Sequence, residues 1–128
     1  MRAGLEFRSI DPDSIKDNVF KLIGKDWMLV TAGTKDSYNT MTASWGGMGI
    51  LWDKKVCITF IRPTRYTFEF LEKSEVYTLS FLEEQYRDIL MYCGTKSGRD
   101  VNKVAETSLT PVFRDGTVYF AEARLVIE

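Results

Sequence analysis

The chain has 128 residues, a length typical of one domain, and 45% of them are hydrophobic. With 17 basic and 18 acidic residues its net charge is −1, which gives no electrostatic reason to expect nucleic acid or an anionic membrane as a partner. The sequence has no histidine, so it lacks the usual general base and the commonest metal ligand. It also has no apolar run near the ~20 residues of a membrane helix, so it predicts no membrane partner.

The first half of the chain predicts one helix followed by strands. Asp11-Pro12 is a capping sequence, and apolar residues at helical spacing from Ile15 to Ile23 predict a helix of about three turns that ends at Gly24. Short apolar or alternating runs bounded by turn residues predict three strands, over residues 27–32, 39–45 and 56–61. The predicted turns between them cover residues 33–39 and 53–55.

The second half predicts two more helices and a terminal group of strands. One helix begins at Tyr66 and ends near residues 73–74, and the other covers residues 83–93 and ends at Gly94. The predicted strands cover residues 76–81, 111–113, 117–120 and 121–127. Strands outnumber helices and the turns are short, which favours a single mainly β domain, an antiparallel β-barrel with helices at its ends, over a parallel doubly wound sheet.

The uncharged stretch from Ser37 to Trp52 is the most unusual part of the sequence. It begins with small polar side chains and continues through Trp45 into Gly46, Gly47 and Gly49. Glycine within a strand pattern marks either a tight bend or a place where another group approaches the backbone. The stretch is therefore either a barrel corner or the wall of a site for a flat polar ligand.

Two basic segments are candidate anion sites. Arg62 and Arg65 lie on either side of Pro63 where a strand passes into a helix, and a helix N-terminus with two guanidinium groups suits a phosphate. The alternative is a pair of surface arginines beside a turn. Residues 96–99 form a second basic loop, which on its own is better explained as a solvated loop than as an anion site.

No set of side chains in the sequence supports catalysis without a cofactor. Neither a Ser-His-Asp nor a Cys-His arrangement can be assembled, so we predict no catalytic side chain and no metal site. Cys57 and Cys93 are expected as free thiols, a pattern typical of a reduced, cytoplasmic protein. Any catalysis therefore requires a bound cofactor.

Three motifs together resemble one family. The segments N-T-M-T-A-S-W (39–45), R-P-T-R-Y-T (62–67) and Y-C-G-T-K-S-G-R-D (92–100) are similar to those of flavin reductase-like proteins with an FMN-binding split barrel, above all the flavoredoxin branch. The resemblance implies an antiparallel, Greek-key-like split β-barrel that forms a homodimer with FMN near the subunit interface. Family chains usually continue further, so the domain, residues 1–128, is expected to be truncated at its C-terminus.

The resemblance also implies a set of FMN-binding residues. Those along the isoalloxazine would be Asn39, Met41, Thr42, Ala43, Ser44 and Trp45. Those at the ribityl phosphate would be Arg62, Arg65, Tyr66 and Thr67. Those closing over the other side of the flavin would be Cys93, Gly94, Lys96, Ser97 and Gly98.

The implied activity is an FMN-dependent oxidoreductase. It would pass hydride or electrons from a reduced donor, such as NADH or NADPH, through FMN to an acceptor. A non-catalytic flavin or nucleotide binder, such as a sensor, is the alternative. An OB-like barrel for nucleic acid is a third interpretation, which has aromatic residues in its favour but lacks a basic groove.

Overall fold

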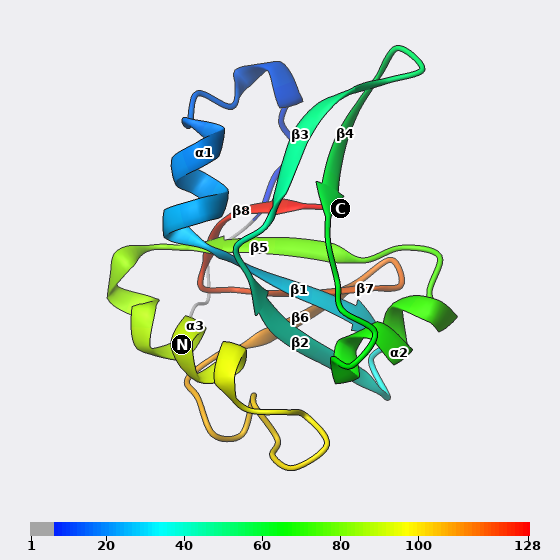
Figure 1. Cartoon of the computed structure of the whole chain (residues 1–128), viewed down its shortest axis with the longest axis vertical. Coiled ribbons are helices and arrows are strands. Elements are labelled where there is room, and N and C mark those ends of the chain that lie inside the picture. Colours follow the sequence, from blue (N-terminus) through cyan, green and yellow to red (C-terminus); the bar gives the residue numbers. More distant parts are fainter. Residues whose placement is uncertain (1–6) are drawn as a thin grey trace.

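Residues 7–128 are described by the structure, a computed structural model, and they fold into three antiparallel sheets with a few helices (Figure 1). The strands are β1 (Met28–Gly33), β2 (Tyr38–Ala43), β3 (Gly46–Leu51), β4 (Lys54–Thr59), β5 (Thr78–Leu82), β6 (Pro111–Arg114), β7 (Thr117–Phe120) and β8 (Ala123–Ile127). The main sheet has the order β2-β1-β5-β8, while β3 pairs with β4 and β6 with β7. The predicted mainly β, antiparallel class is confirmed, and the three sheets of the described residues are not joined into one closed barrel.

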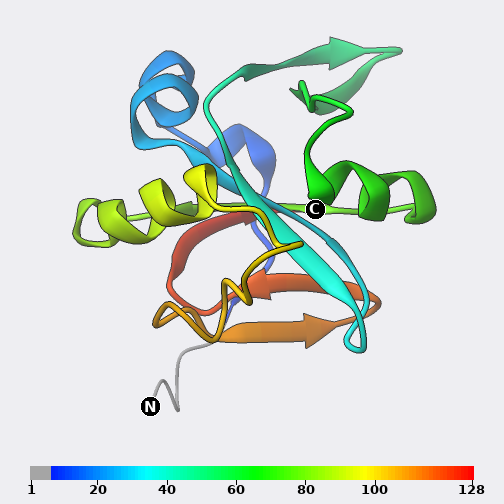
Figure 2. The same ribbon diagram turned by 60° about the horizontal axis from the view of Figure 1, so that its bottom comes forward.

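The helices are short and lie around the main sheet. They are η1 (Pro12–Ser14), α1 (Val19–Lys21), η2 (Leu22–Asp26), α2 (Tyr66–Lys73), η3 (Glu84–Tyr86) and α3 (Arg87–Thr95). Figure 2 shows α2 and α3 on either side of β2, and β6 with β7 as a separate layer. Within residues 7–128, no helix has the length and apolar character needed to cross a membrane.

The helix predicted to span Ile15–Ile23 is wrong at its start. Asp11 caps only a single 3₁₀ turn, and the chain at Ile15 is extended. The helical run instead begins after Asn18, whose side-chain oxygen accepts hydrogen bonds from the N–H groups of Phe20 and Lys21 at 3.0 and 3.2 Å. Asparagine is as good an N-cap as aspartate, and in this chain the helical run begins at the later of the two capping residues.

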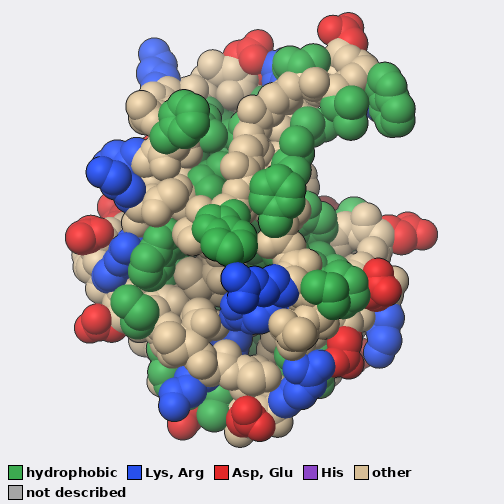
Figure 3. Space-filling model, viewed as in Figure 1, with side chains coloured by type: hydrophobic (Ala, Val, Ile, Leu, Met, Phe, Trp, Pro, Cys, Tyr) green, Lys and Arg blue, Asp and Glu red, His purple; other side chains and the backbone are tan. Residues whose placement is uncertain are grey.

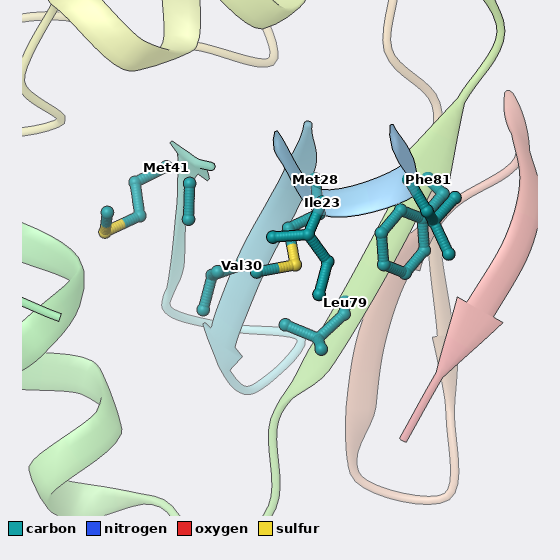
Figure 4. Packing of buried hydrophobic residues seen from close by; sticks show 8 residues of the cluster. Ile23, Met28, Val30, Met41, Leu79 and Phe81 are labelled. Atoms are coloured by element: carbon teal, nitrogen blue, oxygen red, sulfur yellow. The ribbon is translucent and has the colours of Figure 1, made fainter. Parts of the chain in front are cut away.

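The core lies on both faces of the main sheet, because successive side chains of a strand point to opposite faces. Figure 4 shows one cluster, in which Met28 and Val30 of β1 pack with Leu79 and Phe81 of β5, joined by Ile23. The opposite cluster packs α3 against the sheet; its fully buried members are Leu29, Leu90, Cys93 and Phe120. Both clusters hold β2 and the two main helices in fixed positions.

The glycine-rich stretch forms two strands and not one. The chain turns after β2 at Ser44-Trp45 and enters β3 at Gly46, whose φ of 153° and close approach to the Ile58 carbonyl oxygen exclude a side chain. A two-residue turn at Trp52-Asp53, with φ of 51° and 61°, returns the chain into β4. The predicted turn at residues 53–55 is therefore displaced, and the hairpin extends away from the main sheet (Figure 1).

The β3–β4 hairpin carries an exposed apolar surface. Its large exposed side chains, with those of the adjoining residues, are Trp45, Ile50, Leu51, Trp52, Ile58 and Phe60. Figure 3 shows hydrophobic side chains along the hairpin and basic side chains gathered below it in the middle of the same face. We call this group of six residues the hairpin patch.

Candidate functional site

A pocket of ≈ 450 Å³ lies between β2, the start of α2 and the segment that follows α3. Its volume is within the range of ~300–1,000 Å³ typical of small-molecule sites. We call it the α2–α3 pocket. Its lining residues are Asn39, Met41, Thr64, Arg65, Tyr66, Thr67, Gly94, Thr95, Lys96, Ser97, Gly98, Arg99, Asp100 and Lys103.

The strand β2 provides the inner wall of the pocket. Asn39 and Met41 are two residues apart, so both side chains lie on the same face of the strand. The Asn39 amide donates a hydrogen bond to the Thr67 hydroxyl at 2.8 Å, and both residues are buried. This bond fixes the start of α2 against β2, and it leaves the Asn39 carbonyl oxygen and one amide hydrogen for other partners.

The N-terminus of α2 faces the pocket through Arg65, Tyr66 and Thr67. Arg65 is the N-cap residue in an extended conformation, and no side chain caps the helix. The first N–H groups of a helix lack internal partners and carry a partial positive charge. Burial, followed by the nearby charge of Arg62, lowers the pKa of Arg65 from its usual value, as expected for a cation held in a partly enclosed site.

Lys103 is a buried lysine on the pocket wall. It is only 5% exposed, and its ammonium donates hydrogen bonds to the carbonyl oxygens of Thr40 and Cys93 at 2.8 and 2.9 Å. Burial lowers its pKa to about 8. An ammonium group has three N–H donors, so one remains for a ligand.

The loop after α3 closes the pocket on its other side. Gly98 lies so close to Asn39 and Tyr66 that any side chain at this position would collide with the Asn39 amide. The guanidinium of Arg99 lies 4.8 Å from the centre of the Tyr66 ring and forms an ion pair with Glu69 of α2. The loop is thus attached to both β2 and α2.

The charge of the lining favours an anionic ligand. Four lining residues are basic, namely Arg65, Lys96, Arg99 and Lys103, and one, Asp100, is acidic. Because the whole chain has a net charge of −1, this positive charge is local. Guanidinium groups and helix N–H donors together form the donor set that phosphate groups prefer.

Nine of the residues predicted for the FMN site meet in this pocket. They are Asn39, Met41, Arg65, Tyr66, Thr67, Gly94, Lys96, Ser97 and Gly98. Five further lining residues are absent from the predicted set: Thr64, Thr95, Arg99, Asp100 and Lys103. The first four lie inside the two later motifs, which was a signal for including them, whereas Lys103 lies outside all three motifs.

Six predicted site residues do not line the pocket. They are Thr42, Ala43, Ser44, Trp45, Arg62 and Cys93. The Thr42 hydroxyl donates to the carbonyl oxygen of Leu90 at 2.5 Å, and the Arg62 guanidinium lies 5.3 Å from the centre of the Trp45 ring. Cys93 is fully buried, and burial raises the pKa of its thiol to about 11.

A second pocket, of ≈ 280 Å³, lies between η2, the start of α3 and β8. Its three basic residues are balanced by three acidic ones, Asp26, Glu83 and Glu84, and all three basic side chains already have partners. Lys21 contacts Asp26 at 2.9 Å, Arg124 contacts Asp17 at 2.6 Å and Asp26 at 3.9 Å, and Arg87 donates to the carbonyl oxygens of Lys25 and Asp26. Because these ion pairs join neighbouring elements and leave no excess of charge, we interpret this pocket as a structural contact and not as a ligand site. The α2–α3 pocket is therefore the candidate site.

The sequence profile of the flavin reductase like domain matches residues 20–128. The chain belongs to the flavin reductase-like domain family. The matched residues include every described strand of this chain and all three sequence motifs. No curated protein matches the chain.

Solved structures extend this relationship to the flavoredoxin branch. Flavoredoxin of Desulfovibrio vulgaris (Miyazaki F) is 27% identical, with a TM-score of 0.68 over 75% of this chain and 54% of its own. Flavoredoxin from Methanosarcina acetivorans, 17% identical, has a TM-score of 0.69 over 94% of this chain and 61% of its own. The FMN-binding protein from Thermus thermophilus, 21% identical, has a TM-score of 0.70 over 94% and 66%. The predicted family and branch are confirmed, and the chain spans between 54% and 66% of the length of these three proteins.

Proposed function

We propose that this domain binds FMN in the α2–α3 pocket and acts as a flavoprotein of the flavin reductase and flavoredoxin type. The observation that carries the proposal is the local excess of positive charge in the pocket lining, four basic residues against one acidic, beside the N-terminus of α2. The family supports a flavin as the ligand, and the similar protein from Thermus thermophilus is an FMN-binding protein.

The lining residues suit the two ends of FMN. A phosphate fits the side of the pocket formed by Arg65, Arg99 and the start of α2, because this side offers charged donors and free N–H groups. A flat heteroaromatic ring fits the side formed by Asn39, Met41 and Lys103, where Met41 offers apolar contact and Asn39 and Lys103 offer polar groups held in place by hydrogen bonds. Thr42, Ala43, Ser44, Trp45, Arg62 and Cys93 would then contribute only if binding rearranges their present contacts.

Bound FMN would supply hydride and electron transfer from a reduced donor, such as NADH or NADPH, to an acceptor. The protein's own residues would bind and orient the cofactor and exclude water, and none would serve as a general acid or base. We further propose a split barrel completed in a cytoplasmic homodimer, because the hairpin patch offers apolar surface that a second copy can cover.

The experiment compares FMN with riboflavin, which lacks the phosphate. A charge-assisted hydrogen bond contributes roughly 1.5–3 kcal/mol, so Arg65→Ala should weaken FMN by about one to two orders of magnitude and leave riboflavin nearly unchanged. Arg62→Ala is the matched control, because Arg62 lies outside the pocket on Trp45. Fluorescence quenching at micromolar protein measures the affinities of both flavins for the wild type and the two variants.

Two results would contradict parts of this proposal. No binding of FMN by the wild-type protein would refute the flavoprotein function of this chain. Equal losses for FMN and riboflavin in Arg65→Ala would mean that the arginine supports the fold and not the phosphate. If FMN binds but NADH and NADPH fail to bleach its visible spectrum without air, the domain is a flavin binder that uses neither nicotinamide donor.

A further inference from the structure

The loop that closes the α2–α3 pocket is attached to α2 through one side chain. The Arg99 guanidinium forms an ion pair with Glu69, donates a hydrogen bond to the carbonyl oxygen of Thr64 at 3.4 Å, and stacks near the Tyr66 ring at 4.8 Å. Arg99 lines the pocket, whereas Glu69 lies on α2 just outside it. An acidic residue therefore holds one of the four cations that give the pocket its positive charge.

We propose that Glu69 competes with the ligand's anionic group for Arg99, and thereby weakens the binding of phosphate-bearing ligands while it leaves the binding of neutral ligands unchanged. The proposal rests on the proposed function, because it concerns the same pocket. It concerns the strength of anion binding and assigns Glu69 no contact with the flavin.

The other basic lining residues are not held in this way. Lys103 donates to two backbone carbonyl oxygens, which carry no net charge. The charge that acts on Arg65 is that of Arg62, another cation. Within residues 7–128, Arg99 is the basic residue of this pocket that has an ion pair with a carboxylate.

The difference between charged and neutral ligands follows from the competing groups. A phosphate monoester carries up to two negative charges and three strong acceptor oxygens, so it can displace Glu69 from Arg99. Breaking the Arg99–Glu69 ion pair uses part of the phosphate's binding free energy. A neutral ligand leaves the ion pair in place and bears no such cost.

The expected size of the effect is modest. The side chains of Arg99 and Glu69 are 46% and 48% exposed, so their ion pair belongs to the weak, solvent-screened class. Removing the competing carboxylate should therefore tighten phosphate binding by up to about fivefold, which corresponds to about 1 kcal/mol.

The test titrates FMN and riboflavin against three proteins: wild type, Glu69→Gln and Glu72→Gln. Glu72 is an exposed glutamate on the same helix, so its replacement makes the same change of net charge without touching Arg99. Glu69→Gln should bind FMN about threefold to fivefold more tightly and riboflavin unchanged. Glu72→Gln should bind both flavins as the wild type does, and thermal melting checks that all three are equally folded.

A double-mutant cycle with Arg99→Gln isolates the competition. Arg99→Gln alone should weaken FMN, and in that background Glu69→Gln should no longer tighten it. The proposal is overturned if Glu69→Gln weakens FMN, if riboflavin responds as FMN does, or if the gain persists without Arg99.

Inorganic phosphate, followed by thermal shift, separates the proposal from the proposed function. Suppose that the protein binds no FMN, but that Glu69→Gln tightens its binding of inorganic phosphate only when Arg99 is present. This result refutes the flavoprotein function and supports the competition. If the protein binds FMN and Glu69→Gln changes neither FMN nor phosphate binding, the flavoprotein function is supported and the competition is refuted. A protein that binds neither probe contradicts both.

Discussion

Replacing Lys103 with methionine should change how the stability of the protein depends on pH. Lys103 is 5% exposed, and burial lowers the pKa of its ammonium from 10.5 to about 8. The unfolded chain binds this proton up to about pH 10.5, whereas the folded protein releases it near pH 8. Between these values the unfolded state holds more protons, so the wild-type protein becomes more stable as the pH rises.

The size of the effect follows from the two pKa values. At 1.36 kcal/mol per pH unit, a lowering from 10.5 to about 8 corresponds to about 3 kcal/mol. This cost of burying the charge is present in full below pH 8 and disappears as the pH approaches 10.5. Between pH 7 and pH 10, the free energy of unfolding of the wild type should rise relative to that of Lys103→Met by about 2.5 kcal/mol.

Urea unfolding of both proteins at pH 7, 8, 9 and 10 measures this difference, because the titrations of all other groups cancel between them. Lys96→Met is the control, since Lys96 is an exposed lysine of the same pocket and its replacement should give no pH-dependent difference. A difference between wild type and Lys103→Met that stays constant from pH 7 to 10 would refute the reasoning, because it would mean that water reaches the ammonium.

Three further predictions concern the loop, the thiols and the hairpin. Gly98→Ala should lower the free energy of unfolding by about 1–3 kcal/mol, because the added carbon collides with the Asn39 amide. Gly49→Ala is the control in the same urea titration: a carbon added there meets no atom within 4 Å, so the free energy of unfolding should change by less than ~0.5 kcal/mol. The Cys93 thiol, whose pKa burial raises to about 11, should react with a thiol reagent at pH 8 only when urea unfolds the protein. A Cys57→Ala background removes the half-buried second thiol, and rapid labelling of Cys93 in that folded variant would disprove its burial. Trp52→Ser should raise the dissociation constant of the proposed homodimer by about tenfold or more in light scattering across a dilution series, and an unchanged constant would place the interface elsewhere.

Local patterns in the sequence predicted most of the fold. β1, β2, α2 and α3 follow from apolar runs, turn residues and helix ends, all of which act over a few residues. The strand β4 and a turn before it were predicted, but β3 was missed and the turn was placed too late, because Trp52-Asp53 has neither of the residues that usually occupy left-handed positions, glycine and asparagine. The exposed glycines of β3 likewise lack the alternation of a half-buried strand.

The site was predictable only as far as its motifs reach. Asn39, Arg65 and Gly98 lie in segments that are recognisable in the sequence, and the pocket brings them together. Lys103 gave no signal, because its role depends on the Thr40 carbonyl oxygen 63 positions away. Arg62 and Arg65 are equivalent in the sequence, and only the turn between them, in which the Arg65 N–H donates to the Arg62 carbonyl oxygen at 3.0 Å, separates their side chains.

The β3–β4 hairpin also bears on the colloidal behaviour of the domain. In the described chain β3 and β4 pair only with each other, so each has an outer edge of backbone donors and acceptors with no neighbouring strand. Such an edge, next to the apolar hairpin patch, is a template for aggregation by strand addition. Lys54 and Lys55, at the start of β4, oppose this growth, since like charges repel when hairpins stack in register. Salt that screens these lysines removes the repulsion, so ionic strength and protein concentration together decide between closed association and open-ended growth.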